Sequence, residues 1–350
     1  MTPPTMVAAR LHEPGGGLRL DEVPVPRPGA AECLVAVGAC GICGSDLHLL
    51  DGTSPAAAVP VTLGHEASGT VVDTGADVPV ALVGRRVAIN PVVACLRCTA
   101  CRRGRPSICE QRSLVGVHRD GAFAEYVCVP AANLIAIPDD LPLAHAALIE
   151  PMATPFHALT ARAHVRPGDA VAVIGTGGLG LHGVQIARML GATTIVAVDV
   201  DPVARERAAG LGATDLVDPA DGDAARAVRR LTGGGADVAL ECVGRAATVE
   251  LTVGALRPGG CAAIIGVGDE RPSLPPASWL NWKEVDVKGV FAYTSPEMEA
   301  VARCLAAGRL DAAAAISAEY PLAEVPAAIQ HVRERVGSPV RVLVRPGAAA

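Results

Sequence analysis

The sequence contains very few aromatic residues. Phe, Trp and Tyr make up 2% of its 350 residues, whereas hydrophobic residues of all kinds make up 50%. Val, Ile, Leu and Ala must therefore build the core. The chain lacks the aromatic platforms on which single-stranded nucleic acids stack their bases.

The sequence also lacks an excess of basic residues. Its 30 Lys and Arg residues against 36 Asp and Glu residues give a formal net charge of −6. A protein that binds DNA, RNA or an anionic membrane usually carries a basic surface. We therefore expect no nucleic-acid partner and no membrane partner.

Long apolar segments are missing as well. The N-terminus has no apolar run that would suit a signal peptide, and no segment offers the roughly 18 uninterrupted apolar residues of a transmembrane helix. We therefore expect a cytoplasmic protein. In a reducing compartment the eleven cysteines are expected to be thiols rather than disulfides, so clustered cysteines indicate metal binding.

The length and the changing sequence pattern predict two domains, because single cores stop growing at roughly 250 to 300 residues. Residues 1 to about 150 contain Gly, Pro and short β-branched runs such as 33–39 and 68–75, which indicate an antiparallel or barrel-like β domain. From about residue 170, six apolar runs alternate with helical stretches, as in a doubly wound parallel sheet. The segment from about 291 is too short for a third domain, and we expect it to return to the first.

A glycine-rich turn follows the strand-like run AVAVI. Gly175, Gly177 and Gly180 form a G-x-G-x-x-G motif that opens a predicted helix, with Gly178 and Leu179 inside the turn. Gly175 makes the turn, Gly177 lets the backbone approach a pyrophosphate, and Gly180 permits close packing of the helix. The motif alone could be only a tight turn, but its position between a strand and a helix favours a dinucleotide site.

Asp199 ends the next strand-like run, nineteen residues after Gly180. A carboxylate there accepts hydrogen bonds from the ribose 2′-hydroxyl and repels a 2′-phosphate, which predicts NAD rather than NADP. The alternative is that Asp199 is a helix N-terminal residue ahead of Pro202.

Four cysteines, Cys95, Cys98, Cys101 and Cys109, lie within fifteen residues. Their spacing lets a short loop bring four thiolates to the corners of a tetrahedron, which predicts a closed structural zinc site. An iron–sulfur site is an alternative, but the fourth cysteine is too near and no second cluster motif follows. The neighbouring arginines suggest a basic zinc knuckle for nucleic acid, which the net charge and the few aromatics disfavour.

A second group of possible ligands lies upstream. Cys43 offers a thiolate, His65 an imidazole and Glu66 a carboxylate. Such a mixed set suits a catalytic zinc that keeps one position open. Each residue also has a plain structural interpretation: Cys43 as a core hydrophobe, His65 as a buried histidine with its own partner, and Glu66 as a surface charge.

Five motifs in order along the chain carry a family resemblance: GICGSDLH, GHEASG, the four-cysteine loop, LIEPMAT and VIGTGGLG. Together they resemble the zinc-dependent medium-chain dehydrogenase/reductase family, and within it the sorbitol, polyol and 2,3-butanediol dehydrogenase branch. The resemblance implies an α/β protein. A GroES-like, β-rich catalytic domain would comprise residues 1–153 and 291–350, and a Rossmann NAD-binding domain with a doubly wound parallel sheet would comprise 154–290.

The resemblance implies two zinc ions per chain together with NAD. Cys43 and His65 would hold the catalytic zinc with a carboxylate, for which both Glu66 and Glu150 are candidates. We predict Glu66 in the resting state, with Glu150 able to exchange with it or to act through water. The four-cysteine loop would hold the structural zinc.

The same resemblance implies a relay for the proton. Ser45 is expected to hydrogen-bond the reacting oxygen of the substrate and to pass the proton through cofactor ribose hydroxyls to His48, because a hydroxyl both donates and accepts. Asp46 is expected to accept from His65 and fix its tautomer. Alternatively, His48 is merely a loop histidine at the start of a helix.

Gly44 departs from the family pattern, because many relatives carry there a basic residue that grips the pyrophosphate. This departure shifts phosphate binding toward backbone donors and Arg341, which matches a family position facing the cofactor. The alternative for Arg341 is a solvated strand charge.

The activity predicted from these features is reversible transfer of hydride from a secondary alcohol, a vicinal diol or polyol, to NAD, which gives a ketone. One alternative is an amino-alcohol dehydrogenase of the threonine type, although such enzymes tend to carry Asp where Glu150 stands here. The other is a zinc-binding scaffold without catalysis. The resemblance also implies a homodimer or homotetramer. The expected binding partner is the substrate, a small-molecule alcohol or ketone.

Overall fold

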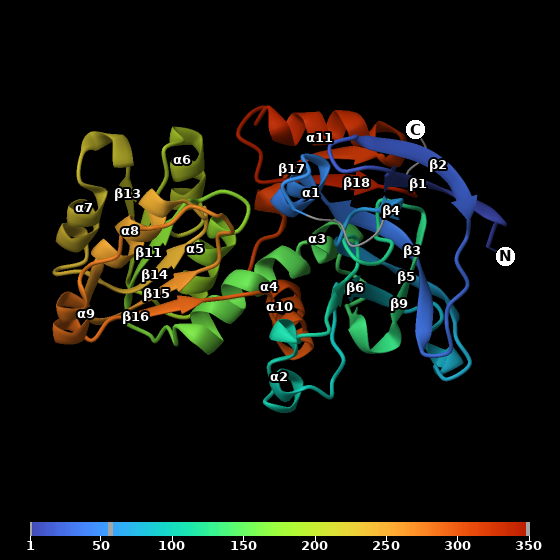
Figure 1. Cartoon of the computed structure of the whole chain (residues 1–350), viewed down its shortest axis with the longest axis horizontal. Helices are drawn as coiled ribbons and strands as arrows, with labels where there is room; N and C mark the ends of the chain where they lie inside the picture. The colour runs from blue at the N-terminus through green and yellow to red at the C-terminus, as the bar shows by residue number, and fades with distance from the viewer. Residues whose placement is uncertain (1, 55–58, 348–350) are drawn as a thin grey trace. The chain divides into compact units, whose positions relative to one another are not determined.

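The structure is a computed structural model that describes residues 2–54 and 59–347 (Figure 1). The chain divides into two compact units, and each has a core and hydrogen-bonded strands of its own. No helix in the described ranges is both long enough and apolar enough to span a membrane. The first unit comprises Met1–Glu150, Thr294–Ala307 and Ala312–Ala350, and the second comprises Pro151–Tyr293 and Gly308–Asp311.

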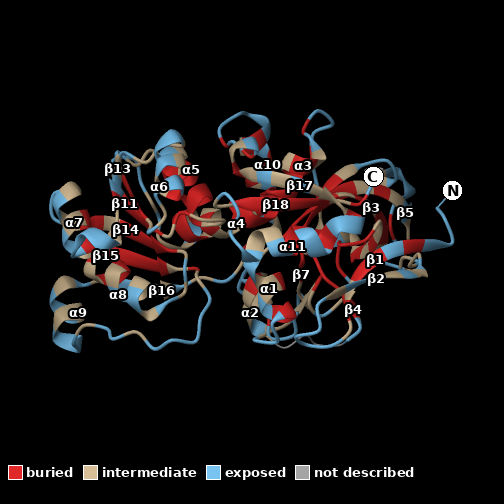
Figure 2. Ribbon diagram, turned by 90° about the horizontal axis from the view of Figure 1, so that it is seen from above, coloured by how far each residue is buried: buried red, intermediate tan, exposed pale blue. Residues whose placement is uncertain are grey.

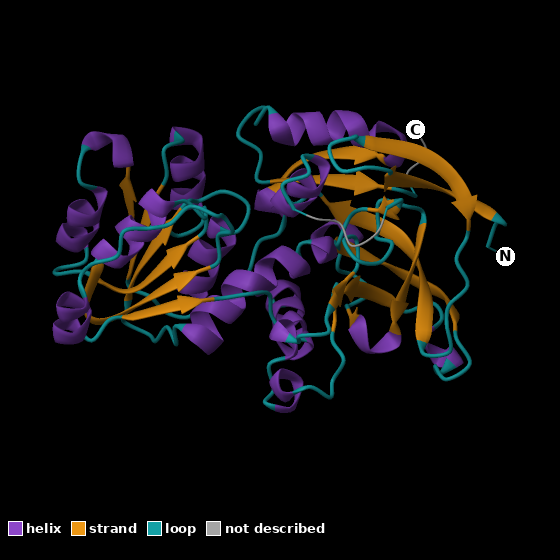
Figure 3. Ribbon diagram, in the orientation of Figure 1, coloured by secondary structure: helices purple, strands orange, loops and turns teal. Residues whose placement is uncertain are grey.

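A six-stranded sheet, parallel throughout, forms the centre of the second unit (Figure 3). Its first strand, AVAVI, is buried at every residue, as expected for a strand covered on both faces. The strands are ordered β13-β12-β11-β14-β15-β16, so the winding reverses between β11 and β14. This is the predicted doubly wound sheet, and such a reversal is where α/β proteins bind ligands.

The elements of this unit are β11 (Ala170–Ile174), α5 (Gly180–Met189), β12 (Thr194–Val198), α6 (Pro202–Gly210), β13 (Asp215–Val217), α7 (Ala224–Leu231), β14 (Ala236–Glu241), α8 (Ala246–Gly254), β15 (Leu256–Ile264), α9 (Ala277–Lys283) and β16 (Asp286–Gly289).

The first unit is built around the long strand β3 (Glu32–Gly41). β5 (Glu66–Thr74) pairs with it antiparallel, and β9 (Tyr126–Pro130) pairs with its beginning. Near its end, β18 (Arg341–Arg345) pairs with it antiparallel, so a strand from the C-terminal segment lies in the same sheet. β18 also pairs in parallel with β17 (Ile316–Pro321), which the sequence pattern does not predict. The end of β3 is therefore flanked by β5 and β18.

The other strands of this unit are β1 (Thr5–Leu11), β2 (Leu18–Pro24), β4 (Val61–Thr62), β6 (Arg86–Ile89), β7 (Val92–Val93), β8 (Ser113–Leu114) and β10 (Leu134–Ala136). Its helices are α1 (Gly44–Leu50), α2 (Thr99–Arg102), α3 (Leu143–Ala147), α10 (Ser295–Ala306) and α11 (Val325–Arg333), while α4 (Ile149–His157) begins in the first unit and ends in the second.

Buried residues follow the strands in both units (Figure 2). Apart from Phe123, Tyr293 and Met152, the largest fully buried side chains are those of Leu and Ile. Burying each such side chain stabilises the fold by roughly 1.5–3 kcal/mol. Buried aliphatic side chains thus hold the strands in place, and the candidate sites lie near the ends of strands.

Candidate metal and nucleotide sites

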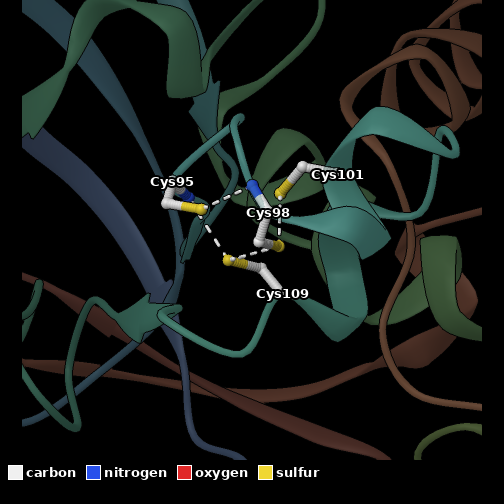
Figure 4. A group of neighbouring side chains, drawn as sticks. All are labelled: Cys95, Cys98, Cys101 and Cys109. Atoms are coloured by element: carbon white, nitrogen blue, oxygen red, sulfur yellow. Dashed lines mark hydrogen bonds between the residues drawn. The ribbon is translucent and has the colours of Figure 1, made fainter.

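The four-cysteine loop lies between β7 and β8, and its sulfurs converge (Figure 4). All four ligand atoms lie within 4.8 Å of one another. The Cys98 Sγ is 3.5 Å from the Cys101 Sγ and 3.8 Å from the Cys109 Sγ. Four thiolates at about 2.3 Å from a zinc ion would be separated by about 3.8 Å, so this arrangement fits tetrahedral zinc.

Backbone N–H groups of the loop already point at these sulfurs. The N–H of Cys98 donates to the Cys95 Sγ, and the N–H of Cys95 donates to the Cys109 Sγ, each at 3.4 Å. Backbone donation, foremost from Cys101, lowers the pKa of Cys98 to about 6. Desolvation and the neighbouring sulfurs instead raise the pKa of Cys101 to about 12. A cation between the sulfurs would deprotonate all of them.

The arginines of the same loop are solvated, as predicted. All four of them are exposed: Arg97, Arg102, Arg103 and Arg105.

The second group of donors is assembled from separate elements. Cys43 immediately precedes α1, His65 immediately precedes β5, and Glu66 is the first residue of β5. One ligand atom of each lies within 4.8 Å of the other two. A thiolate, an imidazole and a carboxylate thus converge, as a catalytic zinc site requires.

The side chain of Asp46 lies next to two members of this group, Cys43 and His65. Its fully buried carboxylate accepts from the N–H of Cys43 at 2.9 Å and lies 3.5 Å from the Nδ1 of His65. Burial alone would lower the pKa of His65, but the negative charge of Asp46, supported by Cys43, outweighs it and raises that pKa well above its usual range. Asp46 thus lies beside a histidine that is 12% exposed, and its predicted role of fixing the tautomer of His65 stays a prediction.

Glu66 is 1% exposed, so its interpretation as a surface charge is wrong. Within the described residues neither of its carboxylate oxygens accepts a hydrogen bond. Its Oε2 lies 3.2 Å from the Nε of Arg341, whose side chain is 5% exposed and donates to the carbonyl oxygen of Ile42. A buried carboxylate without hydrogen-bond donors is costly, and a cation at the oxygens would offset that cost.

Arg341 is therefore buried, and its interpretation as a solvated strand charge is wrong as well. Burial would lower the pKa of its guanidinium, but the charges of Glu66, Cys43, Glu150 and Asp46 together outweigh burial and raise that pKa. Its predicted contact with the cofactor pyrophosphate stays a prediction.

Glu150 and Cys40 lie in the same region. The charge of Glu150, a buried residue of α4, acts on both Cys40 and Arg341, but its carboxylate is not part of the group within 4.8 Å. Burial raises the pKa of Cys40 well above its usual range, which keeps it a neutral thiol. The structure thus brings Glu66, rather than Glu150, to Cys43 and His65.

Ser45 and His48 both lie on α1. The Ser45 Oγ is 3.3 Å from the Nε2 of His65, so the hydroxyl borders the donor group. His48 is exposed, and its Nδ1 lies 3.2 Å from the Oγ1 of Thr53. Residues three apart share a helix face, but their predicted proton relay stays a prediction.

The glycine-rich turn connects β11 to α5. Gly175 has a φ of +83°, which a larger residue adopts only with strain. A Cβ at Gly180 would lie 1.8 Å from the carbonyl oxygen of Gly175, whereas a Cβ at Gly177 would face open space. These environments are consistent with the three predicted roles: the tight turn, the open approach to a pyrophosphate and the close packing of the helix. The helix N-terminus at Gly180 presents its N–H groups there.

Asp199 follows β12 and is tied to this turn. Its Oδ2 accepts from the N–H and the hydroxyl of Thr176 at 2.7 and 3.2 Å, and its Oδ1 accepts from the N–H of Asp201 at 2.9 Å. The residue that caps α6 is Asp201, which accepts from the N–H of Val203. The interpretation of Asp199 as the helix N-terminal residue is therefore wrong.

Comparison with known families gives two matches along the chain. Residues 29–139 match the family described as alcohol dehydrogenase GroES-like domain, and residues 178–307 match zinc-binding dehydrogenase. Together the two matches cover more than half of the chain. The first match confirms the predicted GroES-like fold for the β-rich part.

Relatives match over nearly the whole length. The chain is 33% identical to sorbitol dehydrogenase of Bacillus subtilis (strain 168) over 98% of both chains. It is also 33% identical to L-threonine 3-dehydrogenase of Pyrococcus horikoshii, over 90% of this chain and 91% of the relative. A zinc-binding dehydrogenase of Sinorhizobium meliloti 1021, solved bound to NADP, is 36% identical, with a TM-score of 0.89 over 98% of this chain and 99% of that chain.

Proposed function

The chain belongs to the zinc-dependent medium-chain dehydrogenase/reductase family, and on that premise we propose that it transfers hydride reversibly from a vicinal diol or polyol to NAD. At the coarser level it is an oxidoreductase of the alcohol dehydrogenase type that binds a nicotinamide dinucleotide. The observation that carries the proposal is the convergence of Cys43, His65 and the buried carboxylate of Glu66, which accepts no hydrogen bond within the described residues.

We assign the two donor groups to two zinc ions with different tasks. Zinc held by Cys43, His65 and Glu66 would act as a Lewis acid that polarises the substrate oxygen. The four cysteines form a set of thiolates that leaves no position for a substrate, so that group would serve stability.

The residues around the mixed donor group hold it and move the proton. Asp46, 3.5 Å from the Nδ1 of His65, would hold that ring nitrogen and leave the other one to the metal. Ser45, whose hydroxyl lies 3.3 Å from that nitrogen, is the group that would take the alcohol proton. His48 is exposed on the same helix and would deliver the proton to solvent.

Asp199 supports NAD as the cofactor. Three donors from Thr176 and Asp201 fix the position of its carboxylate. A 2′-phosphate bound there would be repelled by this negative charge, because the carboxylate could not rotate away without losing those hydrogen bonds. Arg205, the nearby cation, donates to the carbonyl oxygen of Asp199 and pairs with Asp218 at 2.9 Å. Arg205 is thus already paired with other groups of the protein. The Sinorhizobium relative was solved with NADP, so cofactor preference is the first part of the proposal to measure.

The substrate class rests on the relatives and on Glu150. The match to sorbitol dehydrogenase extends over 98% of the chain, against 90% for the threonine enzyme at the same identity. Glu150 stands where threonine-type enzymes tend to carry Asp. L-Threonine is therefore the second candidate substrate.

A homo-oligomer, dimer or tetramer, is also part of the proposal. Within the described residues β16 is an edge strand of its sheet, and Trp282, just before it, is 85% exposed. An open strand edge beside exposed apolar side chains is a template for pairing with another chain. Sedimentation of the purified protein as a monomer at micromolar concentration would contradict this part.

Steady-state kinetics test the proposed activity directly. Purified protein is assayed with NAD and with NADP against sorbitol, 2,3-butanediol, L-threonine and simple secondary alcohols. We expect NADH formation with a diol or polyol and a kcat/KM for NAD at least about 10-fold above that for NADP. A preference for NADP would remove the NAD assignment, turnover of L-threonine alone would favour the second candidate, and no turnover of any alcohol would favour the scaffold without catalysis.

A further inference from the structure

Helix α1 ends in a turn that folds back over His48. Gly52, just after the helix, has a φ of +70°, and its N–H donates to the carbonyl oxygen of Leu49 at 3.2 Å. The next N–H, that of Thr53, donates to the carbonyl oxygen of His48 at 3.0 Å. This pair of hydrogen bonds around a left-handed glycine is the Schellman motif, which ends many helices. The motif brings Thr53 back to the last turn of α1, where His48 lies.

The hydroxyl of Thr53 contacts His48 at two points. Its Oγ1 donates to the carbonyl oxygen of His48 at 3.1 Å, and it lies 3.2 Å from the Nδ1 of the His48 ring. A hydroxyl group has one proton to donate and two lone pairs that accept, whereas a carbonyl oxygen only accepts. Because the single proton of the Thr53 hydroxyl goes to the carbonyl oxygen, the Nδ1 of His48 has to be the donor to Thr53.

These contacts select one of the two tautomers of neutral His48. A neutral imidazole carries a single ring proton, so a proton on Nδ1 leaves Nε2 with a free lone pair. In the proposed proton path His48 must first accept the alcohol proton, and only a ring nitrogen with a free lone pair can do so. The other tautomer would place that lone pair against Thr53 instead.

We propose that Thr53 is a positioning residue for the proton path: its hydroxyl holds the neutral ring of His48 in the Nδ1–H form and so keeps Nε2 ready to accept. Thr53 lies outside the motifs that carry the family resemblance, five residues after His48. The inference rests on the proposed function, because it assumes that His48 receives the alcohol proton.

Nitrogen NMR reads this tautomer directly and does not depend on turnover. Protein labelled with ¹⁵N-histidine gives distinct ring signals for each tautomer, and those absent from His48→Gln belong to His48. The pH is raised until these signals stop changing, so that they report the neutral ring. We expect the Nδ1–H form in the wild type and in Thr53→Ser, which keeps a hydroxyl. In Thr53→Val, which has nearly the same shape but no hydroxyl, we expect the Nε2–H form to become the larger share.

Single-turnover kinetics test whether this tautomer serves the reaction. The rate of NADH formation in the first turnover is measured with whichever of sorbitol, 2,3-butanediol and L-threonine is oxidised fastest. Thr53→Val should lower this rate about 5-fold, the scale of one lost hydrogen bond, and leave the KM for the alcohol unchanged. Thr53→Ser should keep the wild-type rate. Ser54→Ala is the matched control, because the backbone N–H of Ser54 donates to the His48 carbonyl oxygen at 3.1 Å and alanine keeps that donor.

A His48→Gln background separates the positioning role from a change in the turn itself. There Thr53→Val should have no further effect on the first-turnover rate, because the ring that Thr53 orients is gone. Because Thr53 is exposed, neither substitution at this position should unfold the chain. An effect that persists in His48→Gln would overturn the role, as would an Nε2–H form in the wild type or a tautomer that Thr53→Val leaves unchanged.

Two further results would reach beyond Thr53. A changed tautomer in Thr53→Val without any loss of rate would overturn the positioning role and remove His48 from the proton path. A wild type that oxidises none of these alcohols would overturn the proposed function and with it the positioning role. The NMR result distinguishes that case from a wrong tautomer, because it is obtained without substrate.

Discussion

The four-cysteine loop and the site of Cys43, His65 and Glu66 both gather donor atoms within 4.8 Å, but they are built in opposite ways. The loop draws its donors from one short segment, whose own N–H groups already satisfy two of the sulfurs. The mixed site draws its donors from two strand ends and leaves buried polar atoms of His65 and Glu66 without hydrogen bonds in the described structure.

This difference supports the two tasks that we propose for these sites. A uniform, locally closed set of thiolates binds an ion and offers no place for a ligand. A mixed set, supported by neighbours such as Asp46 and Arg341, can adjust its coordination and its protons. The contrast leads to four substitutions, which follow from the largest expected effect on the mixed site to the smallest.

His65→Ala should have the largest effect. Removing the imidazole should lower kcat/KM by at least about 10³-fold, because the loss of a Lewis acid costs several kcal/mol of transition-state stabilisation. Zinc content, measured by mass spectrometry, should fall from two ions per chain to one. His12→Ala, which breaks a half-buried pair with Asp21 outside both donor groups, is the control. Undiminished turnover in His65→Ala would show that the mixed site is not the catalytic one.

Ser45→Ala should come second. Loss of the hydroxyl should lower kcat by about 10²-fold, the lower end of the range for general acid–base groups, with both zinc ions retained. Ser54→Ala, beyond the end of α1, should leave kcat unchanged. Full activity in Ser45→Ala would remove this residue from the proton path.

Asp46→Asn should come third. The amide oxygen can still accept from the N–H of Cys43, but the charge beside His65 is lost. We expect zinc at the mixed site to be bound about 10-fold more weakly, measured by competition with a chelator. Unchanged affinity would mean that Asp46 only caps the helix.

Cys98→Ser should have the smallest effect on turnover per folded molecule, within about 2-fold, but it should lower stability. Metal binding to a structural site contributes to folding, so losing it should lower the melting temperature by at least about 5 °C. A loss of turnover as large as that of His65→Ala in a fully folded sample would break the contrast between the two sites.

The sequence predicts local features well. The cysteine spacing, the glycine-rich turn and the six alternating apolar runs each lie within a short segment, and the structure has the loop, the turn and the parallel sheet where they indicate. The family matches extend this agreement to the GroES-like fold.

Features that depend on pairing between strands distant in the chain could not be predicted from the sequence. Strand β17 has the sequence ISAEYP and no buried residue, so its apolar pattern is too weak to predict it. The register that sets Gly41 opposite Glu66, and the strand that brings Arg341 beside them, follow from the sheet topology. The burial of Glu66 and Arg341 is therefore a property of the fold, which neither residue type predicts.

Zinc X-ray absorption on the wild type and on His65→Ala tests the central claim most directly, because it counts sulfur and lighter ligands around the bound metal. We predict a mixed shell of sulfur with nitrogen and oxygen in the wild type, with two zinc ions per chain. In His65→Ala we predict one zinc ion with sulfur ligands alone at about 2.3 Å. Two zinc ions with an unchanged mixed shell in His65→Ala would contradict the division into a structural and a catalytic site.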